Sequence, residues 1–216
     1  MKWLRYVRCC LNCGSLSVAP NGHLCGTCWL QMELDRSTGH FERAQSGGRI
    51  FGTSIWDWQP QKNNALSAFL SQIKGWSGES TWDYLADYLV MAVQAQGFSA
   101  AWSQGKVALV PAPSSRPVKE DHARHLAAAL SRRTSIKVVQ GIKKESAVHQ
   151  RGRARWERSD IALRYHENFS RGDLIDTHVI LVDDVVTTGA TAAVSFATLG
   201  PTKSKEIWCL ANRALL

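Results

Sequence analysis

The chain has 216 residues, of which 44% are hydrophobic, and its formal net charge is +8. This length allows one full core and a small appendage, and no apolar run approaches the roughly 20 residues that a membrane span needs. The first residues lack the continuous apolar segment of a secretory signal, so we expect a cytoplasmic protein. The basic balance permits an anionic partner without identifying one.

Two pairs of cysteines near the start of the chain share the C-x-x-C spacing, Cys10 with Cys13 and Cys25 with Cys28. Four thiolates at this spacing can surround a tetrahedral Zn²⁺, and a cytoplasmic chain does not favour disulfides. A redox pair or four unrelated thiols is the alternative. Cys9 can replace Cys10 as a ligand, although the repeated two-residue spacing favours Cys10. The stretch predicts a structural zinc module.

A segment rich in Gly, Ser, Thr and charge, residues 35–48, predicts a linker after this module. We therefore expect two units, a zinc-binding module with its linker (residues 1–48) and a larger domain (residues 49–216).

Short apolar runs then alternate with segments of helical periodicity. This alternation predicts an α/β fold with a parallel sheet flanked by helices, and it places Cys209 in the core of the last strand. Residues 50–58 predict one or two strands. The other predicted strands are 107–110, 136–139, 179–182 and 206–211, and the predicted helices are 65–73, 81–95, 122–132 and 192–199.

A proline-rich turn, residues 111–116, follows the strand at 107–110. The prolines restrict the backbone of the turn, and Ser114, Ser115 and Arg116 offer small polar groups and a cation at the carboxyl end of a strand. The turn is a candidate anion-binding loop, and an ordinary proline-rich turn is the alternative.

Residues 141–164 form the most basic part of the chain. Cations with an interleaved aromatic residue suit either a pyrophosphate or single-stranded nucleic acid, through charge and base stacking. The alternative is a solvated helix face with Trp156 as its anchor in the core. The candidate pyrophosphate ligands are Lys143 and Lys144, and the candidate nucleic-acid contacts are Arg151, Arg153, Arg155 and Trp156.

The most informative stretch is residues 179–191. Four apolar residues predict a strand buried on both faces, and two carboxylates, Asp183 and Asp184, follow it. A turn with threonines and Gly189 then leads into a helix, whose N-terminus suits a phosphate. Carboxylates repel phosphate but suit sugar hydroxyls or a divalent metal. The stretch predicts a cradle for a phosphorylated sugar, and a buried strand with a polar turn is the alternative.

This stretch resembles the phosphoribosyl pyrophosphate (PRPP) signature of type I phosphoribosyltransferases. The resemblance implies that Asp183 and Asp184 are catalytic-site residues that contact the ribose hydroxyls, with Mg²⁺ bound alongside PRPP. It also implies a PRPP-binding set of Thr187, Thr188, Gly189, Ala190 and Thr191 for the 5′-phosphate, and Ser114, Ser115, Arg116, Lys143 and Lys144 for the pyrophosphate.

The whole chain resembles the ComF family, phosphoribosyltransferase-like proteins linked to natural DNA uptake. The four-cysteine knuckle, residues 73–75, 110–113 and 150–158, and the PRPP signature occur in the family order. One departure is visible, because Val118-Lys119-Glu120 precedes the Asp121-His122 pair where many members carry Arg-Gly-Phe.

The resemblance implies a phosphoribosyltransferase that acts in DNA uptake. The alternative is a non-catalytic scaffold that uses the same fold to bind a nucleotide or single-stranded DNA. Under either function, the implied partners of the protein are PRPP, single-stranded DNA, and DNA-uptake helicase or recombination proteins. We identify no segment in the sequence that would form a hood over an acceptor base. The sequence therefore does not indicate which acceptor substrate the protein would use.

Overall fold

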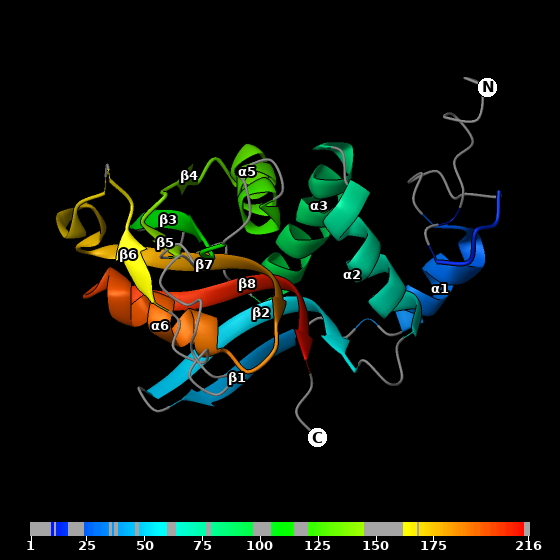
Figure 1. Ribbon diagram of the computed structural model, residues 1–216, viewed down its shortest axis with the longest axis horizontal. Helices are drawn as coiled ribbons and strands as arrows, with labels where there is room; N and C mark the ends of the chain where they lie inside the picture. Colours follow the sequence, from blue (N-terminus) through cyan, green and yellow to red (C-terminus); the bar gives the residue numbers. More distant parts are fainter. Residues whose placement is uncertain are drawn as a thin grey trace, which may run out of the picture.

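The computed structural model of the protein describes residues 10, 12–16, 24–34, 36, 39–45, 48–59, 64–76, 79–96, 105–114, 121–144, 162–167 and 169–213. Its centre is a six-stranded sheet in the order β1-β2-β8-β7-β3-β4 (Figure 1). Neighbouring strands of this sheet run parallel, except that β1 is antiparallel to β2. The strands are β1 (Gly39–Gln45), β2 (Gly48–Trp58), β3 (Lys106–Pro111), β4 (Lys137–Val138), β7 (Thr177–Val186) and β8 (Ser204–Arg213).

Helices cover both faces of this sheet. On one face, α3 packs on α5, and α5 in turn contacts β7 and β3; α6 lies on the other face (Figure 1). The helices are α1 (Gly26–Leu34), α2 (Asn64–Trp76), α3 (Glu79–Ala95), α5 (His122–Thr134), the short 3₁₀ helix η5 (Arg171–Leu174) and α6 (Ala190–Leu199).

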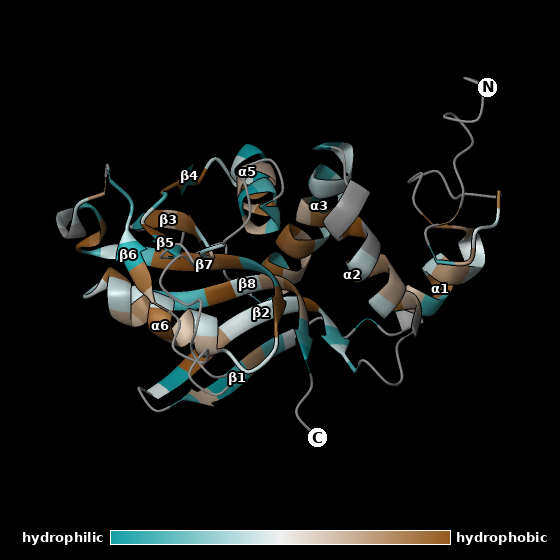
Figure 2. Cartoon of the chain, in the orientation of Figure 1, coloured by the Kyte–Doolittle hydropathy of each residue, from teal (hydrophilic) through white to brown (hydrophobic). Residues whose placement is uncertain are grey.

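The two faces of β7 explain why its sequence is apolar without alternation. Ile180 and Val182 belong to the core under α3 and α5, whereas Val179 and Leu181 belong to the core under α6. Successive side chains of a strand point to opposite faces, so a strand covered on both sides needs an apolar residue at every position. Figure 2 shows hydrophobic residues along this strand in the middle of the sheet.

The structure confirms the predicted α/β class. β7 lies inside the sheet, between β3 and β8, and is parallel to both. β7 continues to Val186, so the two carboxylates belong to its last residues rather than to the turn that follows. The predicted strand at 136–139 is reduced to the two-residue edge strand β4.

Three strands lie where none was predicted. Residues 39–45, within the predicted linker, form the edge strand β1, whose buried side chains include Phe41 and Arg43. The linker prediction is therefore wrong for these residues, although the division of the chain at residue 48 stays a prediction. In the basic region, β5 (Ile142–Lys144) and β6 (Leu163–Tyr165) pair as a separate two-stranded sheet.

Helix α1 begins directly after Cys25, contains Cys28 and contacts α2. Leu24 and Met32, together with three of the cysteines, belong to the same hydrophobic core as α2, α3 and α5. None of the described helices is both long enough and apolar enough to cross a bilayer.

Candidate functional site

The acidic pair lies at the carboxyl end of β7. Asp183 is still paired in the sheet, opposite Cys209 of β8. On the other side, the Ala112 N–H donates to the Val182 carbonyl at 2.8 Å, which brings the proline turn after β3 beside the carboxylates. Parallel strands end at the same edge of a sheet, and ligands of open α/β sheets bind there.

A cavity of about 280 Å³ lies at this edge. It brings together predicted site residues from separate segments and adds the first residues of α5. The predicted residues that line it are Ser114, Lys144, Asp183, Asp184 and Thr191. Asp121, His122 and Ala123, at the start of α5, also line the cavity. The cavity thus combines carboxylates, which accept hydrogen bonds, with hydroxyl groups and one lysine, which donate them. This combination suits a polar ligand that carries both hydroxyl groups and negative charge.

His122 is a site residue to which the sequence assigned no role. Its Nδ1 lies 3.3 Å from Asp184 Oδ2, and its buried ring stacks on Trp82 with centroids 5.8 Å apart and planes 19° apart. Because Trp82 limits the movement of the ring, His122 can hold the Asp184 carboxylate in one orientation. His122 could have been recognised by its position in the sequence, because it is the first residue of a predicted helix that begins at this edge of the sheet.

Asp121 caps the N-terminus of α5 beside the cavity. Its Oδ1 accepts from the Arg124 N–H at 3.2 Å, and its Oδ2 lies 3.2 Å from Arg124 Nε. Burial raises the pKa of Asp121, and these two contacts with Arg124 oppose the rise. The cap satisfies one N–H of the helix start.

The loop Thr187–Gly189, called the phosphate loop below after its predicted role, connects β7 to α6. Gly189 is buried and has a φ of 84°, in the left-handed region that glycine adopts without strain. The Ala190 N–H donates to Thr188 Oγ1 at 3.3 Å. The loop, Ala190 and Thr191 border a second cavity of about 40 Å³. The N-terminus of α6, which is the positive end of the helix dipole, follows the loop directly.

The two lysines of β5 have different surroundings. Lys144 lines the cavity of the acidic pair, whereas Lys143 lines a neighbouring cavity of about 40 Å³ with Ser114 and Asp121. Lys143 Nζ also lies 2.5 Å from Glu167 Oε1, and this hydrogen bond lowers the pKa of Glu167. Lys144 is therefore placed for a ligand of the larger cavity, and a pyrophosphate role for Lys143 stays a prediction.

Several predicted residues lie outside the part of the chain that the structure describes. They are Ser115, Arg116, Arg151, Arg153, Arg155, Trp156 and the alternative zinc ligand Cys9.

The four predicted zinc ligands converge. The Sγ atoms of Cys10, Cys13, Cys25 and Cys28 all lie within 4.8 Å of one another, and the Sγ atoms of Cys13 and Cys25 are 3.6 Å apart. A tetrahedral zinc with Zn–S bonds of about 2.3 Å places its sulfur ligands slightly under 4 Å apart, so the cluster fits this metal. The Asn12 amide also donates to Cys28 Sγ at 3.2 Å, the kind of outer contact that orients a metal ligand.

No protein-family model matches the chain, and no curated protein matches it. Among solved structures, it is similar to the orotate phosphoribosyltransferase from Aeropyrum pernix, with 17% identity over 85% of this chain and 91% of that chain and a TM-score of 0.37. An adenine phosphoribosyltransferase is similar with 14% identity over 84% and 88% of the two chains and a TM-score of 0.41.

A second adenine phosphoribosyltransferase, from Thermoanaerobacter pseudethanolicus, has 15% identity over 85% and 99% of the two chains and a TM-score of 0.38. The chain spans 25% of the allosteric regulatory enzyme of purine biosynthesis, with 18% identity and a TM-score of 0.35. Because all of these TM-scores lie below 0.5, no inference about function rests on them.

Proposed function

We propose that the protein binds PRPP or ribose 5-phosphate at the edge of the sheet where β3 and β7 end. One observation carries this proposal: Asp183, Asp184 and Thr191 share a cavity of about 280 Å³ with Ser114 and Lys144. The carboxylates suit the ribose hydroxyls, and the phosphate loop with the N-terminus of α6 suits the 5′-phosphate. Ser114 and Lys144 then lie on the side available to the pyrophosphate.

As an enzyme, the protein would transfer the phosphoribosyl group. The bond from ribose C1 to the pyrophosphate oxygen breaks, the pyrophosphate leaves with the bonding electrons, and a nitrogen of the acceptor forms the new bond to C1. The carboxylate oxygens of Asp183 and Asp184 would suit Mg²⁺, and a bound Mg²⁺ would offset the charge on the leaving pyrophosphate. Lys144 adds a cation to the lining of the same cavity.

Binding can be measured by calorimetry with PRPP and Mg²⁺. Asp184→Asn should weaken PRPP binding by about tenfold to a hundredfold, because it replaces a charged hydrogen-bond acceptor. Gly189→Val should abolish binding, because the added side chain is bulky and strained at a φ of 84°.

Asp176→Asn is the matched control. Asp176 is exposed and has a φ of 58°, a conformation that asparagine adopts readily, so this variant should bind PRPP like the wild type. A wild-type protein that binds no PRPP at millimolar concentration would contradict the proposal.

The same site also permits a non-catalytic role, in which PRPP or a nucleotide is bound but not consumed. The two roles differ in whether pyrophosphate is released when PRPP is incubated with candidate acceptor bases. Release that depends on one acceptor supports the transferase, and binding without release under every acceptor supports the scaffold.

We further propose, from the ComF resemblance and the net charge of +8, that the protein binds single-stranded DNA during DNA uptake. The basic stretch around Arg151, Arg153, Arg155 and Trp156 is the candidate surface. Replacing Arg153 and Arg155 with alanine should lower DNA affinity and the salt dependence of binding while PRPP binding persists. Fluorescence anisotropy measures the DNA affinity and its dependence on salt. Unchanged DNA affinity in the double variant would remove this stretch from the proposal.

A further inference from the structure

Strand β1 contacts the phosphate loop through a side chain that is distant in sequence. Gln45 Nε2 donates a hydrogen bond to the backbone carbonyl of Thr188, a residue 143 positions along the chain. Gln45 is half-buried and ends β1, which lies at the edge of the sheet. The contact joins an edge strand to the loop that the proposed function assigns to the 5′-phosphate.

The backbone of the loop packs closely on β1 at this point. A Cβ placed on Gly189 would lie 3.3 Å from Gln45 Nε2 and 3.5 Å from Arg43 Cβ. A Cβ at position 189 would therefore displace the end of the Gln45 side chain by a few tenths of an ångström, in addition to being strained at a positive φ. Glycine at this position thus leaves the hydrogen bond from Gln45 undisturbed.

The hydrogen bond from Gln45 determines which way one peptide group of the loop faces. Thr188 and Gly189 share a trans peptide bond, since the described residues contain no cis peptide. In a planar trans peptide, the carbonyl and the N–H point in opposite directions. Holding the Thr188 carbonyl toward β1 therefore turns the Gly189 N–H away from β1, and a flip of this peptide would reverse both groups.

Arg43 holds β1 in the position that this contact needs. Its buried guanidinium donates from Nη2 to Asn212 Oδ1 and to the Arg213 carbonyl at the end of β8. Its Cζ also lies 5.6 Å from the centroid of the Phe41 ring. These contacts tie β1 to the end of β8, while the Cβ and Cγ of Arg43 lie beside Gly189 of the loop.

We propose that Gln45 is a positioning residue for phosphate binding: it holds the Thr188–Gly189 peptide so that its N–H, rather than its carbonyl oxygen, faces the ligand. This inference rests on the proposed function, because it concerns the same loop. A carbonyl oxygen facing the phosphate would repel it, whereas an N–H donates to it. β1 thus prepares the loop before the ligand arrives, which lowers the cost of ordering it on binding.

Gln45→Met tests this role, because methionine has a similar length and no donor. Calorimetry should show affinity for ribose 5-phosphate weakened by about threefold to tenfold, the range expected for one neutral hydrogen bond. Affinity for pyrophosphate should be unchanged, because the loop does not bind it. Amide hydrogen exchange in residues 187–190 should be faster in the variant without ligand.

Glu42→Gln is the matched control, since Glu42 lies on the same strand and its carboxylate pairs with exposed Arg49 at 3.1 Å. It should leave all three measurements unchanged. Equal ribose 5-phosphate affinity in wild type and Gln45→Met would overturn the inference, as would an equal loss of pyrophosphate affinity. If the wild type binds no ribose 5-phosphate, the proposed function fails, while faster exchange confined to the loop would still support the positioning of the peptide by Gln45.

Discussion

Glu206 is a carboxylic acid that β8 carries into the interior. Burial raises the pKa of Glu206 to about 7, and the hydrogen bond from Trp208 Nε1 opposes the rise. Trp208 itself is fully buried on the face of the sheet under α3 and α5. At neutral pH the folded protein therefore contains a partly ionised carboxylate in a site that prefers the neutral acid.

The sign of the pH effect follows from this raised pKa. The folded state binds the proton more tightly than the unfolded state, so Glu206 destabilises the protein as the pH rises from about 4.5 to about 7. Glu206→Gln keeps an acceptor for Trp208 without the charge. We expect this variant to unfold at a temperature a few degrees higher than the wild type at pH 8, with no gain at pH 4. Thermal unfolding at both pH values checks this, and exposed Glu79→Gln should show no such difference.

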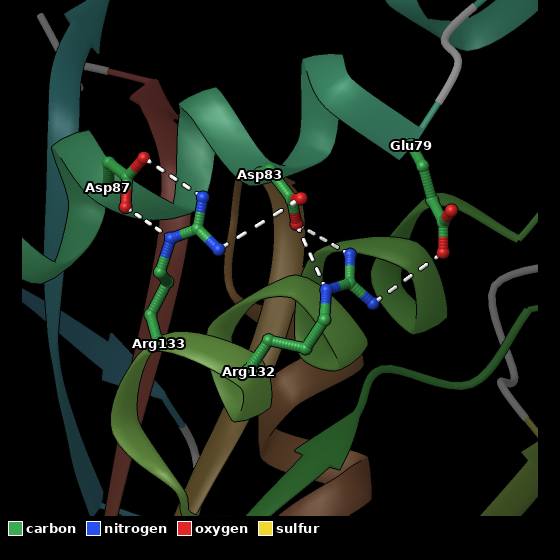
Figure 3. Close-up of polar contacts among 5 residues, drawn as sticks. All are labelled: Glu79, Asp83, Asp87, Arg132 and Arg133. Carbon is green, nitrogen blue, oxygen red and sulfur yellow. Dashed lines mark hydrogen bonds and ion pairs between the residues drawn. The ribbon is translucent and has the colours of Figure 1, made fainter.

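At the scale of elements, a row of ion pairs joins α3 to α5 (Figure 3). Arg132 pairs with Asp83 at 2.5 Å and reaches Glu79 at 3.7 Å, and Arg133 pairs with Asp87 at 2.5 Å and reaches Asp83 at 3.9 Å. Asp83 is thus shared by both arginines. These helices carry Trp82 and His122, so the ion pairs support the packing that positions His122 beside Asp184.

Asp83→Ala should cost more stability than Asp87→Ala, because Asp83 serves two arginines. Exposed ion pairs contribute little individually, so we expect a loss of about 1 kcal/mol for Asp83→Ala and a smaller one for Asp87→Ala. Urea unfolding in low and high salt measures both, and the difference between the variants should shrink as salt screens the charges. An equal loss in both variants, or one insensitive to salt, would show that the shared carboxylate has no special role.

At the scale of the whole molecule, aromatic rings join α1, which carries Cys28, to α3. Trp29 of α1 lies 5.6 Å from the Tyr84 ring and 5.5 Å from the Tyr88 ring of α3, and Arg36 Cζ lies 5.0 Å from the centroid of Tyr88. Each of these contacts contributes about 0.5–1.5 kcal/mol. A metal held by four cysteines would therefore supply much of the stability of this part of the chain.

Cys13→Ser should release zinc and loosen α1 without unfolding the sheet. We expect about one zinc per wild-type chain by elemental analysis and much less in the variant, because a structural zinc site uses all four ligands. Amide exchange should become faster across residues 24–34 and stay slow in β7. Cys209→Ala removes a cysteine outside the cluster and should retain the zinc. Stoichiometric zinc in Cys13→Ser would show that the cluster is not its site.

The sequence by itself determined the features that depend on neighbouring residues. An uninterrupted apolar run predicted β7 as an interior strand, the residues after it predicted the carboxylates and the phosphate loop, and the cysteine spacing predicted the cluster. These features could be predicted because strand burial, helix starts and C-x-x-C turns are set by residues a few positions apart.

Only the tertiary structure decided which distant residues meet. The contact of His122 with Asp184 and that of Gln45 with Thr188 depend on how α5 and β1 pack on the sheet. β1 was missed because its seven residues are mostly polar and only Phe41 and Arg43 among them are buried. An edge strand gains its stability from pairing with β2 rather than from its own pattern, so its place, and the support it gives to the phosphate loop, follow from the packed sheet alone.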